Sequence, residues 1–186
     1  KFFNDVGYCW DRLKNIAWHE NSSCDVLIYD AEGSKLIGYC IPVNAKVNVL
    51  KVREGLPMIR SAYFFLLLFF NLCKCLEPRR ALYTTLINIW KPKVVITFID
   101  TNASMGRIKS IFPSIPCISV QNGSLWSLSR PFQPQLTHDH YYCFGDVEGD
   151  IMIQGSHSVA RLYPIGSLSA GIFLDQYPPQ KTKTFD

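Results

Sequence analysis

The sequence lacks a concentrated block of basic residues and carries little charge of either sign. Charged residues make up 18% of its 186 positions, hydrophobic residues make up 48%, and the formal net charge is +4. A disordered chain would be more charged, and a nucleic-acid-binding domain would gather its Lys and Arg in one place. The closest approach to a basic cluster is the pair Arg79 and Arg80. The composition therefore predicts one folded domain with a real core and no nucleic-acid partner.

Several sequence motifs of common enzyme classes are also absent. No G-x-G-x-x-G follows a predicted strand and no Walker A sequence occurs, which argues against NAD enzymes and P-loop NTPases. The G-x-S-x-G elbow of Ser/His/Asp hydrolases is missing, and the serine in 122–126 has the wrong context. No internal repeat, low-complexity tract or N-terminal signal peptide is visible.

The cysteines and histidines form no clear metal-binding pattern. The seven cysteines are odd in number and irregularly spaced, and Cys73 and Cys75 are separated by one residue rather than two. Reduced cysteines in a cytoplasmic protein are the favoured interpretation. His138 and His140 would share one face of a strand without a third ligand, so we predict a solvated edge and no metal, with metal binding as the alternative.

One long apolar run, from Ala62 to Cys73, requires an interpretation. A bilayer-spanning helix needs roughly 20 apolar residues, and this run ends before Lys74. We therefore predict a buried helix. The alternative is a helix that presses on a membrane surface or on a protein partner.

Apolar strands alternate with helices along the rest of the chain. Predicted strands cover 25–30, 47–52, 93–99, 117–120, 141–144 and 160–165, and predicted helices cover 1–20, 58–76, 81–90, 104–112 and 147–153. This alternation predicts an α/β fold, a Rossmann-like parallel sheet flanked by helices. Residues 1–177 would form a single lobe, and 178–186 a linker or tail.

Polar or small residues follow four successive predicted strands. In an open parallel sheet, ligands bind outside the carboxyl ends of the strands, so these residues would line one rim. Each also has a local explanation as a helix cap or tight turn. As a group they predict a site for sugars or sugar phosphates, made of Asp100, Thr101, Asn102, Gln121, Asn122, Gly123, Gly145, Gly166 and Ser167.

These stretches resemble a known family. "KPKVVITFIDTNAS", "PCISVQNGSLW", "YYCFGD" and "YPIGSLSAGIF" are similar to the N-terminal half of bacterial surface-carbohydrate (capsule or lipopolysaccharide) biosynthesis proteins, which are glycosyltransferase-like and of GT-B type. The resemblance extends from about Asp25 to Leu174. It implies the N-terminal, acceptor-side lobe of an enzyme with two Rossmann-like lobes, inactive without the C-terminal lobe.

The resemblance also implies roles for individual residues. Asp100 would be catalytic, as the base that deprotonates the acceptor hydroxyl or as the nucleophile at the anomeric carbon, and the other rim residues would bind substrate. The blander alternative is that Asp100 only caps the following helix. A nucleotide sugar would be the donor substrate of a hexosyl- or ulosonic-acid-transferase, with no covalently bound cofactor.

Three functions remain open at this point. The first is the transferase lobe in surface polysaccharide biosynthesis. Such a protein would be cytoplasmic, and the alternative location is the inner face of the cytoplasmic membrane. The second is a non-catalytic Rossmann-like module that binds a glycan or nucleotide sugar. The third is a scaffold held at a membrane by the apolar helix 62–73.

Overall fold

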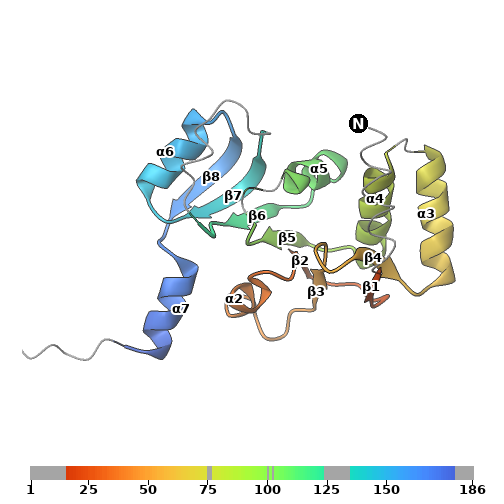
Figure 1. Cartoon of the computed structure of the whole chain (residues 1–186), viewed down its shortest axis with the longest axis horizontal. Coiled ribbons are helices and arrows are strands. Elements are labelled where there is room, and N and C mark those ends of the chain that lie inside the picture. Colours follow the sequence, from red (N-terminus) through yellow and green to blue (C-terminus); the bar gives the residue numbers. More distant parts are fainter. Residues whose placement is uncertain (1–15, 75–76, 100, 102, 124–134, 179–186) are drawn as a thin grey trace, which may run out of the picture.

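The computed structural model describes residues 16–74, 77–99, 101, 103–123 and 135–178. Its centre is a six-stranded parallel sheet in the order β3-β2-β5-β6-β7-β8 (Figure 1). The strands are β2 (Val26–Tyr29), β3 (Val47–Leu50), β5 (Val94–Thr97), β6 (Cys117–Val120), β7 (Thr137–Cys143) and β8 (Ser158–Pro164). The predicted Rossmann-like α/β fold is confirmed.

Helices lie on both faces of this sheet. Their bounds are α2 (Ser34–Gly38), α3 (Ala62–Lys74), α4 (Pro78–Trp90), α5 (Ser104–Ile111), α6 (Asp146–Gln154) and α7 (Leu168–Gln176). Leu27 and Tyr29 of β2 pack into one core with α4 and α5, whereas Val26 and Ile28 pack on the α2 side. Alternate residues of β2 are thus buried on opposite faces, which explains its continuous apolar sequence.

A separate two-stranded sheet corrects two helix predictions. Its strands β1 (Ile16–His19) and β4 (Leu56–Ile59) pair in parallel. The end of the predicted helix 1–20 is therefore a strand, and residues 1–15 lie outside the described part of the chain. The predicted helix 58–76 begins only at Ala62. Pairing between two distant segments outweighed the helical spacing in each segment.

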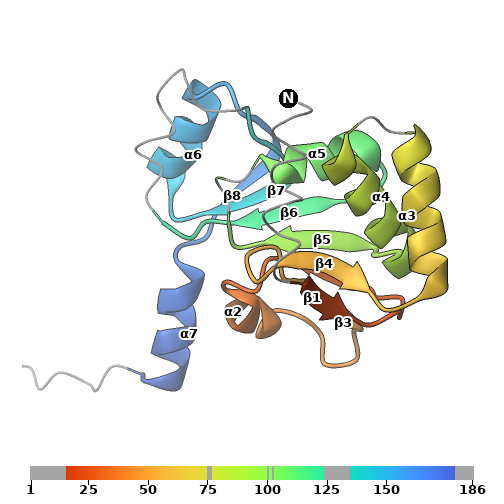
Figure 2. The same cartoon turned by 45° about the vertical axis from the view of Figure 1, so that its right-hand side comes forward.

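The burial of α3 also differs from the prediction. Of its side chains only Phe64 and Asn71 are buried, and α3 lies outside α4 at the periphery of the molecule (Figures 1 and 2). A buried helix was therefore the wrong interpretation of the run 62–73. Among the described residues, no helix is long and apolar enough to cross a bilayer.

The chain reverses direction across the sheet between β2 and β5. From β2 it moves outward to β3, and after α3 and α4 it returns to β5 on the other side of β2. Later strands then add in sequence order away from β5. The carboxyl ends of β2 and β5 flank the switch point of the sheet, which is the place where open parallel sheets bind their ligands.

Candidate functional site

The loop that follows β2 brings a buried carboxylate to the switch point. Asp30 comes directly after the last residue of β2 and is 2% exposed. Its backbone has φ 80°, a left-handed conformation that is uncommon outside glycine, although Asp tolerates it better than most residues. Strained backbone of this kind is concentrated at functional sites, so Asp30 marks this loop as a candidate.

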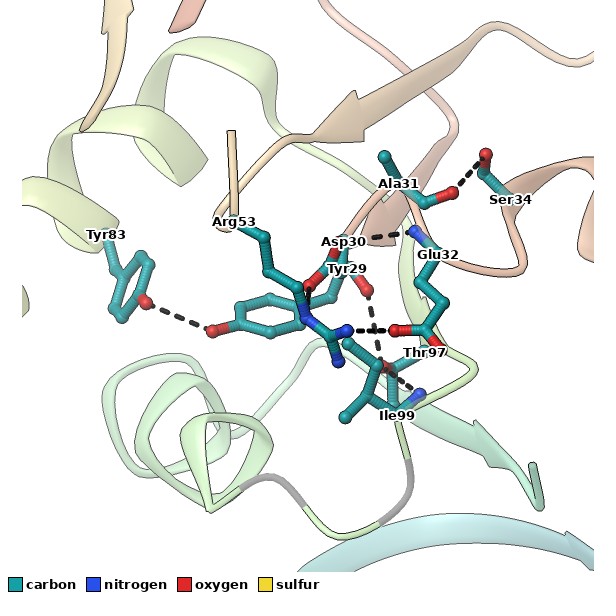
Figure 3. Close-up of polar contacts among 9 residues, drawn as sticks. All are labelled: Tyr29, Asp30, Ala31, Glu32, Ser34, Arg53, Tyr83, Thr97 and Ile99. Atoms are coloured by element: carbon teal, nitrogen blue, oxygen red, sulfur yellow. Dashed lines mark hydrogen bonds and ion pairs between the residues drawn. The ribbon is translucent and has the colours of Figure 1, made fainter. Parts of the chain in front are cut away.

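Arg53 joins two carboxylates of the loop (Figure 3). Its Nε lies 2.8 Å from Oδ2 of Asp30, and its Nη1 contacts Oε2 of Glu32. The backbone N–H of Glu32 also donates to Oδ1 of Asp30 at 3.2 Å. The side chains of Arg53 and Glu32 are 56% and 43% exposed, so a guanidinium and a carboxylate reach solvent beside a buried acid.

Close packing fixes the rest of this loop. Gly33 has φ 70°, and a Cβ built on it would lie 2.3 Å from the ring of Phe98. Only glycine fits both that conformation and that approach. The Ser34 hydroxyl donates to the Ala31 carbonyl at 2.7 Å, which closes the turn into α2. Both the packing of Gly33 on Phe98 and the hydrogen bond of Ser34 therefore restrict the conformation of this loop.

The ends of β2 and β5 are tied together behind the loop. The buried Thr97 hydroxyl donates to the Tyr29 carbonyl at 3.3 Å and accepts from the Ile99 N–H at 3.0 Å. Beneath it, the hydroxyls of Tyr29 and Tyr83 lie 3.1 Å apart, and burial followed by the neighbouring Tyr29 raises the pKa of Tyr83 well above its usual value. This floor is neutral and rigid, so the charged groups of the site lie above it.

The predicted rim residues after β5 fall mostly outside the described structure. Asp100, the predicted catalytic residue, and Asn102 are both outside the described residues. Thr101 is described and exposed. It follows β5, beside the Asp30 loop at the switch point, because β2 and β5 are neighbours in the sheet. The predicted rim and the Asp30 cluster thus belong to the same edge.

Gln121 supports the neighbouring loops with its side chain. Its Oε1 accepts from the Phe144 N–H at 2.7 Å, and its Nε2 donates to the Gly123 carbonyl at 2.8 Å. It is 1% exposed, whereas Asn122 and Gly123 are exposed. In the described structure, Gln121 thus joins the ends of β6 and β7, and Asn122 is the rim amide that faces solvent.

The remaining rim residues follow β7 and β8. Gly145 is the residue before α6, with extended backbone. Gly166 has φ 91° and leads to Ser167, whose hydroxyl oxygen accepts from the Ala170 N–H at 3.3 Å and caps α7. Gly166 and Ser167 line a groove of about 420 Å³ between α7 and the end of α2. Although β8 is the last strand, Gly166 also lines a cavity with Ile37 of α2 and Ile96 of β5, so this end of the rim turns back toward α2.

The two histidines of β7 occupy different environments. Nδ1 of His138 lies 2.7 Å from the Ser119 hydroxyl in the core, and burial followed by His157 lowers the pKa of His138 to about 4. His140 stacks on Tyr163 instead. The predicted solvated edge is therefore wrong for His138. No group of three metal-ligating side chains occurs among the described residues.

Sequence reasoning missed the Asp30–Glu32–Arg53 cluster, although one signal was present. Asp30 follows a buried apolar strand just as Asp100 does. The predicted strand 25–30 includes Asp30, but no functional role was predicted for its end. Arg53 gives no such signal, because only the fold places the β3–β4 connection beside the β2 loop.

Comparison with protein-family models, curated proteins and solved structures yields no significant match. The resemblance to surface-carbohydrate biosynthesis proteins therefore stays a prediction.

Proposed function

We propose that this chain is the sugar-recognising, acceptor-side lobe of a glycosyltransferase-like protein of surface polysaccharide biosynthesis. The observation that carries the proposal is the switch-point cluster, a buried Asp30 bound to a half-exposed Arg53 that also contacts Glu32. It lies at the edge where open parallel sheets bind their ligands.

The chemistry of this cluster suits a hydroxyl-rich or phosphorylated ligand. Carboxylate oxygens accept hydrogen bonds from sugar hydroxyls, and a guanidinium donates a planar pair of hydrogen bonds to phosphate or carboxylate. In Arg53, Nε forms an ion pair with the Asp30 carboxylate, and Nη1 forms one with the Glu32 carboxylate. Glu32 offers the exposed carboxylate, and Asn122 an amide with both donors and acceptors.

In this proposal Asp100 retains its predicted catalytic role. A carboxylate after β5 would stand beside the Asp30 loop and take the proton of a bound acceptor hydroxyl. The nucleotide-sugar donor would bind largely to a second lobe. Transfer of sugar therefore needs that lobe, whereas binding of an acceptor does not.

The proposal is tested by titrating the chain with ligands while recording amide NMR spectra. The ligands are methyl glycosides of common hexoses, UDP-glucose and GDP-mannose. We expect saturable shifts at 30–34, 53 and 97–101 and a roughly tenfold weaker affinity in Glu32→Gln, because one charged hydrogen bond contributes about 1.5 kcal/mol. Asp150→Asn, which removes an exposed carboxylate of α6, should leave the affinity unchanged. Shifts confined to other regions, or none at millimolar ligand, contradict the proposal.

A non-catalytic binding module is the second candidate, and the contacts of Asp30 favour it. This buried carboxylate already binds Arg53 and the Glu32 N–H, so it holds the loop in place. Asp100→Asn separates the two candidates in a protein that contains both lobes. A loss of turnover with unchanged acceptor affinity supports the transferase, and binding with no turnover in the parent protein supports the module.

A further inference from the structure

An apolar surface covers the outer side of α3. Its exposed large side chains are 43–61% accessible, and at 3.6 residues per turn they cover roughly half of the helix circumference. Monomeric proteins rarely expose so many neighbouring large apolar groups without a binding role. We call this set the α3 surface, and it consists of Tyr63, Phe65, Leu66, Phe69, Phe70 and Leu72.

Basic residues stand at both ends of the α3 surface. Arg60 precedes the helix and Lys74 is in its last turn, and both are exposed. Exposed Arg80, in the first turn of the packed helix α4, adds a third positive charge beyond Lys74. No acidic residue occurs from Arg60 to Lys74. At about 1.5 Å per residue, the positive charges of the two ends are roughly 20 Å apart along the axis.

One aromatic side chain outside the helix, that of Trp18, extends the α3 surface. Trp18 of β1 is 46% exposed, and the guanidinium of Arg60 lies 4.9 Å from the centre of its ring. Trp, Tyr and basic side chains with long stems are the residues that favour the boundary between headgroups and acyl chains. The end of α3 near β1 therefore has the same mixture of aromatic and basic groups as an interfacial helix.

From this complementarity we propose that the α3 surface binds the face of an anionic lipid bilayer. The helix lies parallel to the membrane plane, its aromatic and leucine side chains enter the acyl boundary, and Arg60 and Lys74 contact lipid phosphates. This binding is peripheral, because α3 has 13 residues and a spanning helix needs roughly 20. The inference does not depend on the sugar-recognition proposal.

A second copy of the chain is a poorer occupant of the same surface. A symmetric dimer would use the α3 surface of both copies. Antiparallel helices would set Arg60 against Lys74, and parallel helices would set each basic residue against its equivalent. Both arrangements bring like charges together with no acid in the helix to compensate, which costs affinity.

Vesicle flotation of the whole chain tests the proposal. The vesicles contain phosphatidylcholine alone or with 30% phosphatidylglycerol. We expect binding to the anionic vesicles and at least tenfold weaker binding to the neutral ones. Phe69→Ser with Phe70→Ser should weaken binding to anionic vesicles tenfold or more. Arg60→Gln with Lys74→Gln should weaken it about 25-fold, because each basic residue near an anionic surface contributes roughly fivefold.

The matched control is Phe173→Ser with Leu174→Ser, which changes two equally exposed apolar residues of α7. It should bind like the parent chain, and circular dichroism should show all variants folded. The proposal is overturned if the parent chain does not float with anionic vesicles or if the α7 variant loses as much affinity. It is also overturned if the chain sediments as a dimer that Phe69→Ser with Phe70→Ser dissociates, while lipid binding is unchanged. If Phe69→Ser with Phe70→Ser does not fold, the proposal is tested by Arg60→Gln with Lys74→Gln alone, and unchanged binding of that variant to anionic vesicles overturns it.

Discussion

Helices α3 and α4 are neighbours in sequence, each has 13 residues, and they pack against each other, yet they are buried to opposite extents. The more apolar helix, α3, buries Phe64 and Asn71, whereas α4 buries seven residues and carries Arg79, Arg80 and two threonines. The helix that a hydropathy profile would place inside is the one at the periphery. Hydrophobicity alone therefore does not decide which helix lies on the sheet.

The difference follows from pattern and topology. Three large residues of α4, Tyr83, Leu86 and Trp90, lie on one face and join the core formed by β2 and β5. That one-sided pattern is typical of a helix that covers a sheet. The apolar residues of α3 surround the helix, so whichever face packs on α4, another remains exposed. The proposed membrane contact would cover this exposed face. The following predictions test the contrast between α3 and α4.

The largest expected effect is the loss of the α4 core at Trp90. This residue is fully buried, its indole N–H donates to the Glu20 carbonyl at 3.0 Å, and His19 packs edge-on against it. Trp90→Ala should lower the free energy of unfolding by about 3–5 kcal/mol, because it creates a large cavity and leaves a carbonyl unpaired. Chemical denaturation measures this loss. A cost below about 1 kcal/mol would mean that α4 is not the inner helix.

The second prediction concerns the two histidines of β7, of which His138 is buried and His140 is half-buried. It predicts how the free energy of unfolding depends on pH. The folded pKa of His138 is about 4 and its ordinary value is 6.5, so the unfolded chain binds more protons between these values. The stability that neutral His138 contributes is present above pH 6.5 and is lost as pH falls toward 4, a loss of about 3 kcal/mol.

His138→Gln isolates this contribution, because the amide keeps a hydrogen-bonding partner for Ser119 but does not titrate. As the pH falls from 7 to 4, the unfolding free energy of the parent should decrease more than that of the variant. His140→Gln, which changes the half-buried histidine that stacks on Tyr163, is the comparison for the loss of a histidine from the same strand. Equal pH dependence in the parent and His138→Gln would refute the assignment.

A smaller effect is expected at the polar contact between the two helices. The buried amide of Asn71 donates to the Thr85 hydroxyl at 2.9 Å, and that hydroxyl donates to the Ala81 carbonyl at 2.8 Å. Thr85→Val should cost about 1–3 kcal/mol, because it leaves the amide of Asn71 without its acceptor. Combining it with Asn71→Leu should recover most of this loss. A double-mutant cycle by denaturation measures the coupling, and simple additivity would show that the contact is unimportant.

The elements of the central sheet could be predicted from the sequence because each carries a strong local signal. Cys117–Val120 is a strand with the predicted bounds. The predicted α5 is one residue too long at its end, and the predicted α6 is one residue too short at each end. Errors arose where distant contacts decide the structure. The pairing of β1 with β4 turned 16–19 into a strand, and the placement of α4 left α3 outside.

For the candidate site, the sequence predicts only the edge of the sheet at which it lies and not the side chains that meet there. The rule that ligands bind beyond parallel strands directed attention to the residues after β5 and β6, and their role in binding stays a prediction. It could not show that the reversal lies between β2 and β5, because strand order is not encoded locally. It also could not show that the amide of Gln121 is used by Gly123 and Phe144, since those partners are set by neighbouring loops.

The smallest expected change is at Phe69, and it tests the contrast within α3 itself. Phe69 is 61% exposed, whereas Phe64, on the same helix, is fully buried against α4 and the core. Phe64→Ala should cost about 3–5 kcal/mol of unfolding free energy, and Phe69→Ser should change it by less than about 0.5 kcal/mol. Thermal and urea unfolding in lipid-free buffer measure both. Equal, large losses would show that the outer face of α3 is already covered within the chain, and the α3 surface would then have no room for a membrane.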